Sequence, residues 1–172
     1  MKALTLACAA VLLSGCGAGD RAADTTDTTM QQAAEQADSK LDATLGAIEP
    51  GVEWTHGVTT TGSCDVSRRR VVMTVISRER VGSLLGLVQR SWEKAGYRIK
   101  SVNRDEEFPA IYAQSPDGFG IALTVGAKRQ VFFEATTPCV KPSDVASPTT
   151  PPHGPAYNHP VPRPNVHSDF WS

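Results

Sequence analysis

The chain of 172 residues lacks the long apolar run and the strong net charge by which membrane-spanning and nucleic-acid-binding proteins are recognised. A helix through the membrane needs roughly 20 apolar residues, whereas the apolar run at residues 3–13 is shorter and contains Thr5. Lysine and arginine number 17 against 18 aspartate and glutamate, so the formal net charge is −1. This balance does not favour a polyanionic duplex, and we expect neither a spanning helix nor a nucleic-acid partner.

Motifs of catalysis and of cofactor binding are also missing. The sequence contains no G-x-S-x-G, no H-E-x-x-H, no phosphate-binding loop and no recognisable pair of glycosidase carboxylates. Of the four cysteines, none is in C-x-x-C spacing, and no partnered histidine lies near Cys64 or Cys139, which argues against a metal site. We therefore expect no cofactor, no metal ion and no enzymatic activity.

The features that are present begin with the first 16 residues. Met1-Lys2 gives a positive start, and the apolar run at 3–13 is typical of a secretory signal. The stretch Leu13-Ser14-Gly15-Cys16 resembles a bacterial lipobox, which implies removal of residues 1–15 and a diacylglyceryl thioether on Cys16. Two acyl chains give stable attachment where one gives only marginal binding. The resemblance predicts an extracytoplasmic protein, lipid-anchored at the outer face of the plasma membrane; the alternative is a plain signal peptide with a coincidental cysteine.

Removal of the signal and lipidation would change the count of free thiols. Cys8 leaves with the signal and Cys16 carries the lipid, so Cys64 and Cys139 remain as a pair in an oxidising compartment. We expect a disulfide between them. Because the loop that it closes is long, it could stabilise the fold by about 4–5 kcal/mol in the chain-entropy model. Two free buried thiols are the alternative.

Composition divides the mature chain into three parts. Residues 16–28 are small and polar, without periodicity, which predicts a flexible tether. Residues 29–140 show helical and strand periodicity and predict one α+β domain, with its core at 53–140. Residues 141–172 contain recurrent prolines and few apolar residues, and predict a disordered tail with polyproline-II character.

Two helices are predicted in the domain. The first spans about 29–47, and its narrow, alanine-rich stripe predicts light packing or an extension of the tether that is only partly ordered. Its apolar residues are Met30, Ala34, Ala37, Leu41, Leu45 and Ile48. The second helix opens at Ser77 and ends before Gly96, which is placed for the left-handed position after a helix. Its broad apolar face consists of Val81, Leu84, Leu85, Val88, Trp92 and Ala95.

Strands account for most of the remaining domain. They are predicted at 53–63, 70–77, 97–103, 110–115, 119–125 and 130–136. A slip of phase at Lys100-Ser101 predicts a bulge, and Pro116-Asp117-Gly118 predicts a turn. Since most connections are short, the fold class is α+β: a largely antiparallel sheet covered on one face by the second, amphipathic helix, with an extra N-terminal helix.

Arginines are the candidate binding residues. Segment 64–104 contains ten lysines and arginines against three acids. Such a local excess favours an anionic partner, for example lipid headgroups, a wall polymer or a polyanionic glycan. The alternative is an ordinary solvated surface. The residues that we expect to form the anion site are Arg68, Arg69, Arg70, Arg78 and Arg80.

Histidine offers the other candidate chemistry. His56, beside Trp54 on the first predicted strand, could act as the base of a hydrolase, but no Ser or Asp partner is recognisable by spacing, so a half-exposed strand histidine is the simpler interpretation. His153, His159 and His167 lie in the predicted tail, where a metal site would carry a large ordering cost.

Several stretches of the chain together carry a likeness to known proteins. Besides the lipobox, they are 64–70, 80–97, 116–119 and Pro138-Cys139. With these stretches the chain resembles a group of small actinobacterial surface lipoproteins, a likeness that implies no known activity. We predict a monomeric, non-enzymatic binding module whose partner is an anionic envelope component or a protein. A hydrolase that uses His56 and a structural wall spacer with an interacting tail are the alternatives.

Overall fold

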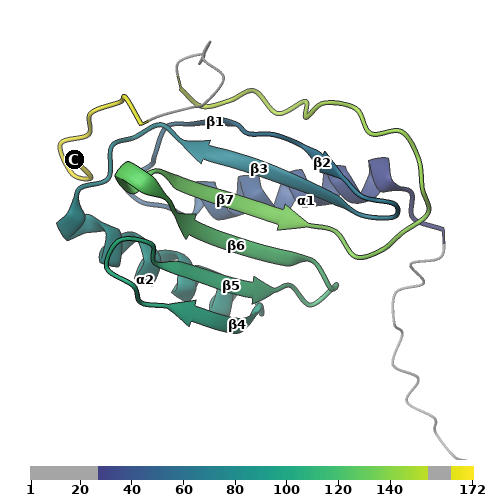
Figure 1. Ribbon diagram of the computed structural model, residues 1–172, viewed down its shortest axis with the longest axis horizontal. Coiled ribbons are helices and arrows are strands. Elements are labelled where there is room, and N and C mark those ends of the chain that lie inside the picture. The colour runs from purple at the N-terminus through teal and green to yellow at the C-terminus, as the bar shows by residue number, and fades with distance from the viewer. Residues whose placement is uncertain (1–26, 155–163) are drawn as a thin grey trace, which may run out of the picture.

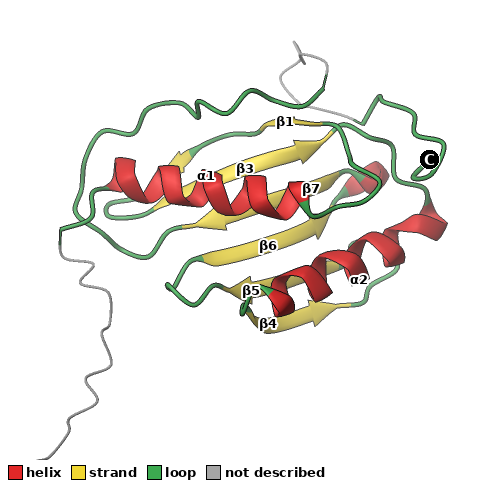
Figure 2. Ribbon diagram, turned by 180° about the vertical axis from the view of Figure 1, so that it is seen from behind, coloured by secondary structure: helices red, strands yellow, loops and turns green. Residues whose placement is uncertain are grey.

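The computed structural model describes residues 27–154 and 164–172. It shows an α+β fold, as the sequence predicts: one seven-stranded antiparallel sheet with two helices on the same face (Figures 1 and 2). The predicted signal peptide, Cys16, nearly all of the predicted tether and His159 lie outside the described residues. In the described parts of the chain no helix is both long and apolar enough to cross a membrane.

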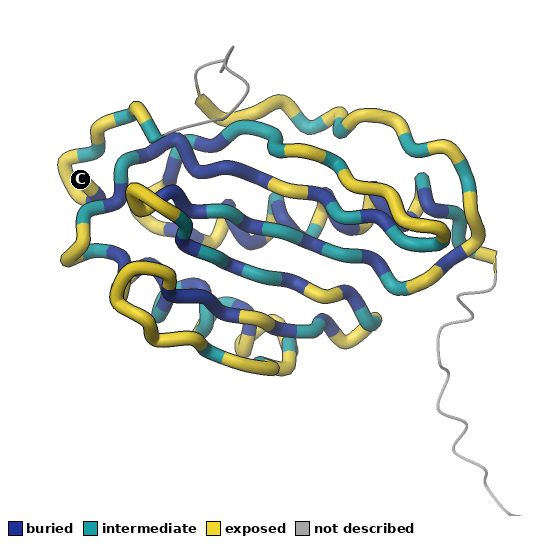
Figure 3. Tube along the Cα trace, in the orientation of Figure 1, coloured by how far each residue is buried: buried dark blue, intermediate teal, exposed yellow. Residues whose placement is uncertain are grey.

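The sheet is a four-stranded meander extended by the N-terminal strands. Its strands are β1 (Trp54–His56), β2 (Thr60–Thr61), β3 (Val66–Val72), β4 (Arg98–Asn103), β5 (Ala110–Gln114), β6 (Gly120–Val125) and β7 (Val131–Thr136). Their spatial order is β1-β3-β7-β6-β5-β4, and β2 also pairs with β3. Helix α2 carries the chain from β3 to the far edge at β4, and the meander returns until β7 pairs with β3. Buried and partly exposed residues alternate along β6 and β7, since one face of each strand meets the helices (Figure 3).

Helix α2 (Arg78–Lys94) follows the predicted pattern. Five of the six predicted apolar residues are buried, and they are Val81, Leu84, Leu85, Val88 and Trp92. Gly96 has a φ of +81°, which confirms the predicted left-handed residue after the helix. The indole Nε1 of Trp92 donates to Thr44 Oγ1 at 3.0 Å and so links the two helices.

Helix α1 (Met30–Gly46) packs fully on β3 and β7, so the prediction of light packing is wrong. Ala34, Ala37 and Leu41 have no measurable exposure. The small side chains that suggested weak packing have the opposite effect, because they let the helix approach the sheet closely. Thr29 begins the helix with a capping box in which Gln32 is the partner.

Strand β3 begins earlier than the sequence predicts. Arg68 and Arg69 were expected in a polar connection and Arg70 at the start of the strand, but all three lie in the middle of β3, and Arg68 and Arg70 point toward α1. Three consecutive arginines are typical of an exposed loop. In a strand, however, the first and third side chains point to the same face, and they can be buried where acidic side chains pair with them. The first predicted strand is divided into β1 and β2. The predicted bulge is confirmed by a shift of register between Ile99 and Ser101.

The predicted disulfide is present. Cys64 and Cys139 are joined with an S–S distance of 2.05 Å and lie 75 residues apart in the sequence. The bond ties the turn before β3 to the segment that follows β7. Beside it, the Val140 amide donates to the Cys64 carbonyl at 2.7 Å.

The prediction of a disordered tail is wrong for the parts that the structure describes, 141–154 and 164–172. The first part runs along α1 and β1, and the Trp54 amide donates to the His153 carbonyl at 2.7 Å. In the second part Trp171 is 1% exposed, and its Nε1 donates to the Pro50 carbonyl at 2.7 Å. Prolines suit an extended segment at a sheet edge, and a single large aromatic residue provides the apolar area that holds its end.

Candidate functional site

Arg68 and Arg70 are buried beneath α1 and face the acids of that helix. Arg68 Nε lies 3.1 Å from Asp38 Oδ2, and Arg70 Nη2 lies 2.8 Å from Asp38 Oδ1. Arg70 Nη2 also lies 3.1 Å from Asp42 Oδ1. A single carboxylate thus bridges two guanidinium groups. Buried charges need such partners, because an unpaired charge in the interior is costly.

The remaining contacts of these two arginines are also internal. Arg68 donates to Thr59 Oγ1 and to the Ala146 carbonyl, both at 2.7 Å. The guanidinium of Arg70 lies 4.8 Å from the centre of the Trp54 ring, whose face attracts a cation. Both guanidinium groups are therefore buried inside the fold, and in this structure neither is accessible to the external anion that the sequence predicts.

Of the other three predicted arginines, Arg69 and Arg78 are exposed and Arg80 is partly buried, and the three lie apart. Arg69, on the sheet face without helices, pairs with Glu134. Arg80 lies 4.2 Å from the centre of the Phe170 ring in the tail. Arg78, at the start of α2, pairs with Glu106 at 2.8 Å. The five residues thus do not form one site, and only Arg78 lines the cavity described below.

His56 is half-buried and held by the tail. Its Nε2 donates to the Thr150 carbonyl at 2.7 Å, and its ring meets the edge of Trp54 at 5.3 Å. Burial is the main cause that lowers the pKa of this imidazole below its ordinary 6.5. Within the described residues no hydroxyl or thiol nucleophile is hydrogen-bonded to it, so the geometry does not support the hydrolase.

A groove of about 510 Å³ lies between α2 and the segment that joins β4 to β5. This volume falls in the ordinary range of small-molecule sites. Apolar side chains from α2 and three strands form its floor, which consists of Val81, Leu85, Val102, Ile111 and Val125. The floor belongs to the core of the domain, since Ile111 is fully buried.

On the α2 side of the groove, two glycines leave space that a side chain would otherwise fill. Gly82 and Gly86 stand four residues apart on α2, so they lie on one face of the helix. A Cβ atom added at Gly82 would meet nothing within 4 Å. Any larger residue here would extend into open space, and the groove therefore depends on glycine at this position.

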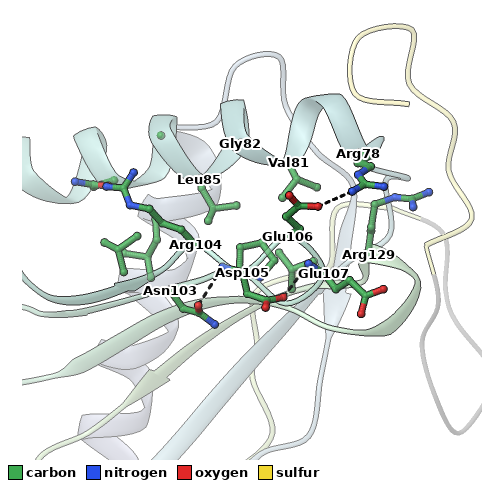
Figure 4. Close-up of a pocket in the computed structure, with 16 residues that line it drawn as sticks. Arg78, Val81, Gly82, Leu85, Asn103, Arg104, Asp105, Glu106, Glu107 and Arg129 are labelled. Atoms are coloured by element: carbon green, nitrogen blue, oxygen red, sulfur yellow. Dashed lines mark hydrogen bonds and ion pairs between the residues drawn. The ribbon is translucent and has the colours of Figure 1, made fainter.

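The opposite wall is the 104–109 loop, which its own hydrogen bonds fix. Asp105 Oδ1 accepts from the amides of Glu107 at 2.9 Å and Phe108 at 2.8 Å, and the Phe108 bond is the largest cause that lowers the pKa of Asp105. The Asp105 amide in turn donates to Asn103 Oδ1 at 3.1 Å. The next carboxylate, that of Glu106, is thereby turned toward α2, where it meets Arg78 (Figure 4).

One end of the groove carries two arginines. Arg78 comes from α2, and Arg129 from the 3₁₀ turn η1 (Ala127–Arg129) before β7 (Figure 4). Arg129 Nε donates to the Ile76 carbonyl at 3.1 Å, just before α2 begins. Lys128 and Arg129 both have a φ of +58°, an uncommon conformation for residues other than glycine. An apolar floor that ends at two cations can hold a molecule with an apolar body and a polar end.

Of the residues that the sequence predicts to bind a ligand, only Arg78 lines this groove. Glu106 and Arg129 were missed because each lies in a loop far from α2 in the sequence, and only the fold brings them together. The pair Gly82 and Gly86, inside an otherwise good helix, was the one local signal that could have indicated a cavity. Among the described residues there is no cluster of three or more His, Cys, Asp or Glu that could hold a metal ion.

Comparison with family models and with curated proteins finds no match to this chain. Among solved structures, the chain is similar to the crystal structure of a DUF4853 family protein from Actinomyces odontolyticus, with a TM-score of 0.43 and 15% sequence identity. The alignment covers 82% of this chain and 76% of that chain. A likeness at this level carries no information about a ligand.

Proposed function

We propose that this protein is a non-enzymatic binding module, lipid-anchored through Cys16 on the extracytoplasmic side of the membrane, and that its ligand occupies the groove between α2 and the 104–109 loop. The lipobox-like stretch at 13–16 supports the anchor. The groove supports the binding role, because it combines an apolar floor with polar side chains at its rim, as ligand sites do. The charged residues of the rim are Arg78, Arg104, Asp105, Glu106, Glu107 and Arg129.

The placement of the groove relative to the start of α1 is the observation that carries the proposal. Helix α1 begins at one end of the molecule, and the 104–109 loop and the start of α2 lie at the other end (Figure 1). A helix of 17 residues is about 25 Å long. A tether that joins the domain at Thr29 would therefore hold the groove on the side that faces away from the membrane.

Calorimetric titration with octyl amphiphiles tests the binding role. The full chain in phosphatidylcholine nanodiscs would be titrated with octanoate, octyl phosphate and octyl glucoside, with empty nanodiscs as the background. We expect saturable binding of at least one of them to the native chain. Gly82→Leu should abolish it, since the leucine side chain fills the groove without a clash at its Cβ.

Ser83→Leu is the matched control, because Ser83 is the exposed neighbour of Gly82 on the same helix and does not line the groove. It adds the same side chain and should leave the affinity unchanged. The proposal fails if none of the three amphiphiles binds saturably, or if both leucine variants bind like the native chain.

A further inference from the structure

We infer that the ligand of this groove is an amphiphile with one anionic group, held at its charged end by Arg78 and Arg129 and lying with its apolar part on the floor of the groove. The inference rests on the proposed binding role and names its ligand class. It replaces the extended polyanion that the run of arginines suggested, because an apolar floor does not suit a wall polymer or a glycan with charges along its length.

The two arginines lie at the same end of the groove (Figure 4), and Arg129 is the better held of the two. Both line the groove and also an adjoining cavity of about 290 Å³, which Glu106 lines as well. Arg129 is held by its Nε, which donates to Ile76. Within residues 27–154 and 164–172, no ion pair or hydrogen bond engages its two Nη atoms. These atoms are the donors with which arginine binds a carboxylate or a phosphate.

At the same end of the groove, two consecutive residues have an unusual backbone conformation. Lys128 and Arg129 are consecutive residues in the left-handed region, which other residue types than glycine enter at a cost. Such conformations gather where the position of a side chain matters for function. Here they place Arg129 beside the start of α2, opposite the 104–109 loop.

Glu106 already places an anion at this end of the groove. Its carboxylate is an anion supplied by the chain itself, and it accepts from Arg78 Nη2 at 2.8 Å. The two side chains are 71% and 83% exposed, so the pair is weak and screened by solvent. An incoming anion whose apolar part is also bound can displace Glu106 from Arg78, because it brings the additional burial that Glu106 lacks.

The same titration tests this ligand class. We expect octanoate or octyl phosphate to bind the native chain about tenfold more tightly than the uncharged octyl glucoside, as a charge-assisted pair provides. Tighter binding of octanoate would identify a carboxylate, and tighter binding of octyl phosphate a phosphate; either result supports the inference.

Charge-removing variants locate the anion. Arg78→Gln and Arg129→Gln should each lower the affinity for the preferred anion about tenfold and leave that for octyl glucoside unchanged. Glu106→Gln should raise the affinity for the anion about two- to fivefold, since it removes the internal competitor. Arg98→Gln is the control, because this exposed arginine of β4 donates to Gln114 and does not line the groove.

The outcomes separate the two proposals. If octyl glucoside binds as tightly as the anions, and binding is lost in Gly82→Leu but not in either arginine variant, the groove is a binding site and the anionic ligand class is wrong. If no amphiphile binds saturably, the binding role and the ligand class fail together. Arg78 is exposed, so Arg78→Gln is a test that does not depend on packing.

Discussion

At the scale of single residues, Asp38 is the position on which the interior of the domain most depends. Its carboxylate is the shared partner of Arg68 and Arg70, both of which are almost fully buried. A buried ion pair contributes little over an apolar pair of the same shape, but the removal of one partner leaves an uncompensated charge. The three charges are therefore best understood as one unit.

Asp38→Asn should lower the free energy of unfolding by about 3–5 kcal/mol, because two buried guanidinium groups then face an uncharged amide. Urea titration followed by circular dichroism measures this change. Glu35→Gln, an exposed acid on the same helix, should change the free energy by less than about 0.5 kcal/mol. Equal effects of the two substitutions would mean that Arg68 and Arg70 are solvated and remain available to an external anion.

At the scale of elements, α2 carries both core packing and the proposed site. Its buried side chains hold the sheet, while Gly82 and Gly86 leave the groove open. Glycine inside a helix lowers its stability, so a helix that contains two of them is less stable than its apolar pattern permits. The proposed binding role accounts for this cost.

Gly82→Ala should raise the free energy of unfolding by about 0.5–1 kcal/mol, since alanine is the better helix former and its Cβ meets no atom within 4 Å. The midpoint of thermal unfolding should rise accordingly. A lower midpoint would show that the space beside Gly82 is filled, and that the groove is not open in solution.

The elements that sequence predicted well are those with a strong local pattern. The helix from Ser77 to Gly96, the bulge near Lys100 and the turn at Gly118 each follow from a few neighbouring residues. The start of strand β3 was misplaced because the burial of Arg68 depends on Asp38, an acid 30 residues away in the sequence. The groove was missed for the same reason, as its two walls come from separate parts of the chain.

At the scale of the whole molecule, the described tail belongs to the domain. Trp171 fills a buried position. Residues 141–154 accept hydrogen bonds from the edge strand β1 and from Arg68, and so cover both. An uncovered edge strand invites pairing with other chains. The tail therefore completes the fold, and it is not a separate interacting arm in the parts that the structure describes.

Trp171→Ala should lower the free energy of unfolding by about 3–5 kcal/mol, through the lost packing and the lost bond to Pro50. Its neighbour Phe170, which is 37% exposed, provides the comparison, and Phe170→Ala should cost clearly less. Chemical denaturation measures both. A tail that is not packed in solution would give no change in either variant.

Acylation of Cys16 is the modification on which both the proposed compartment and the direction in which the groove faces depend. The intact mass of the protein purified from membranes is its most direct test. We expect a chain that begins at residue 16 and carries a diacylglyceryl group, with the same result for Cys8→Ala. Cys16→Ala should lose the lipid mass. A native protein without lipid at Cys16, or with residues 1–15 still attached, would contradict the account.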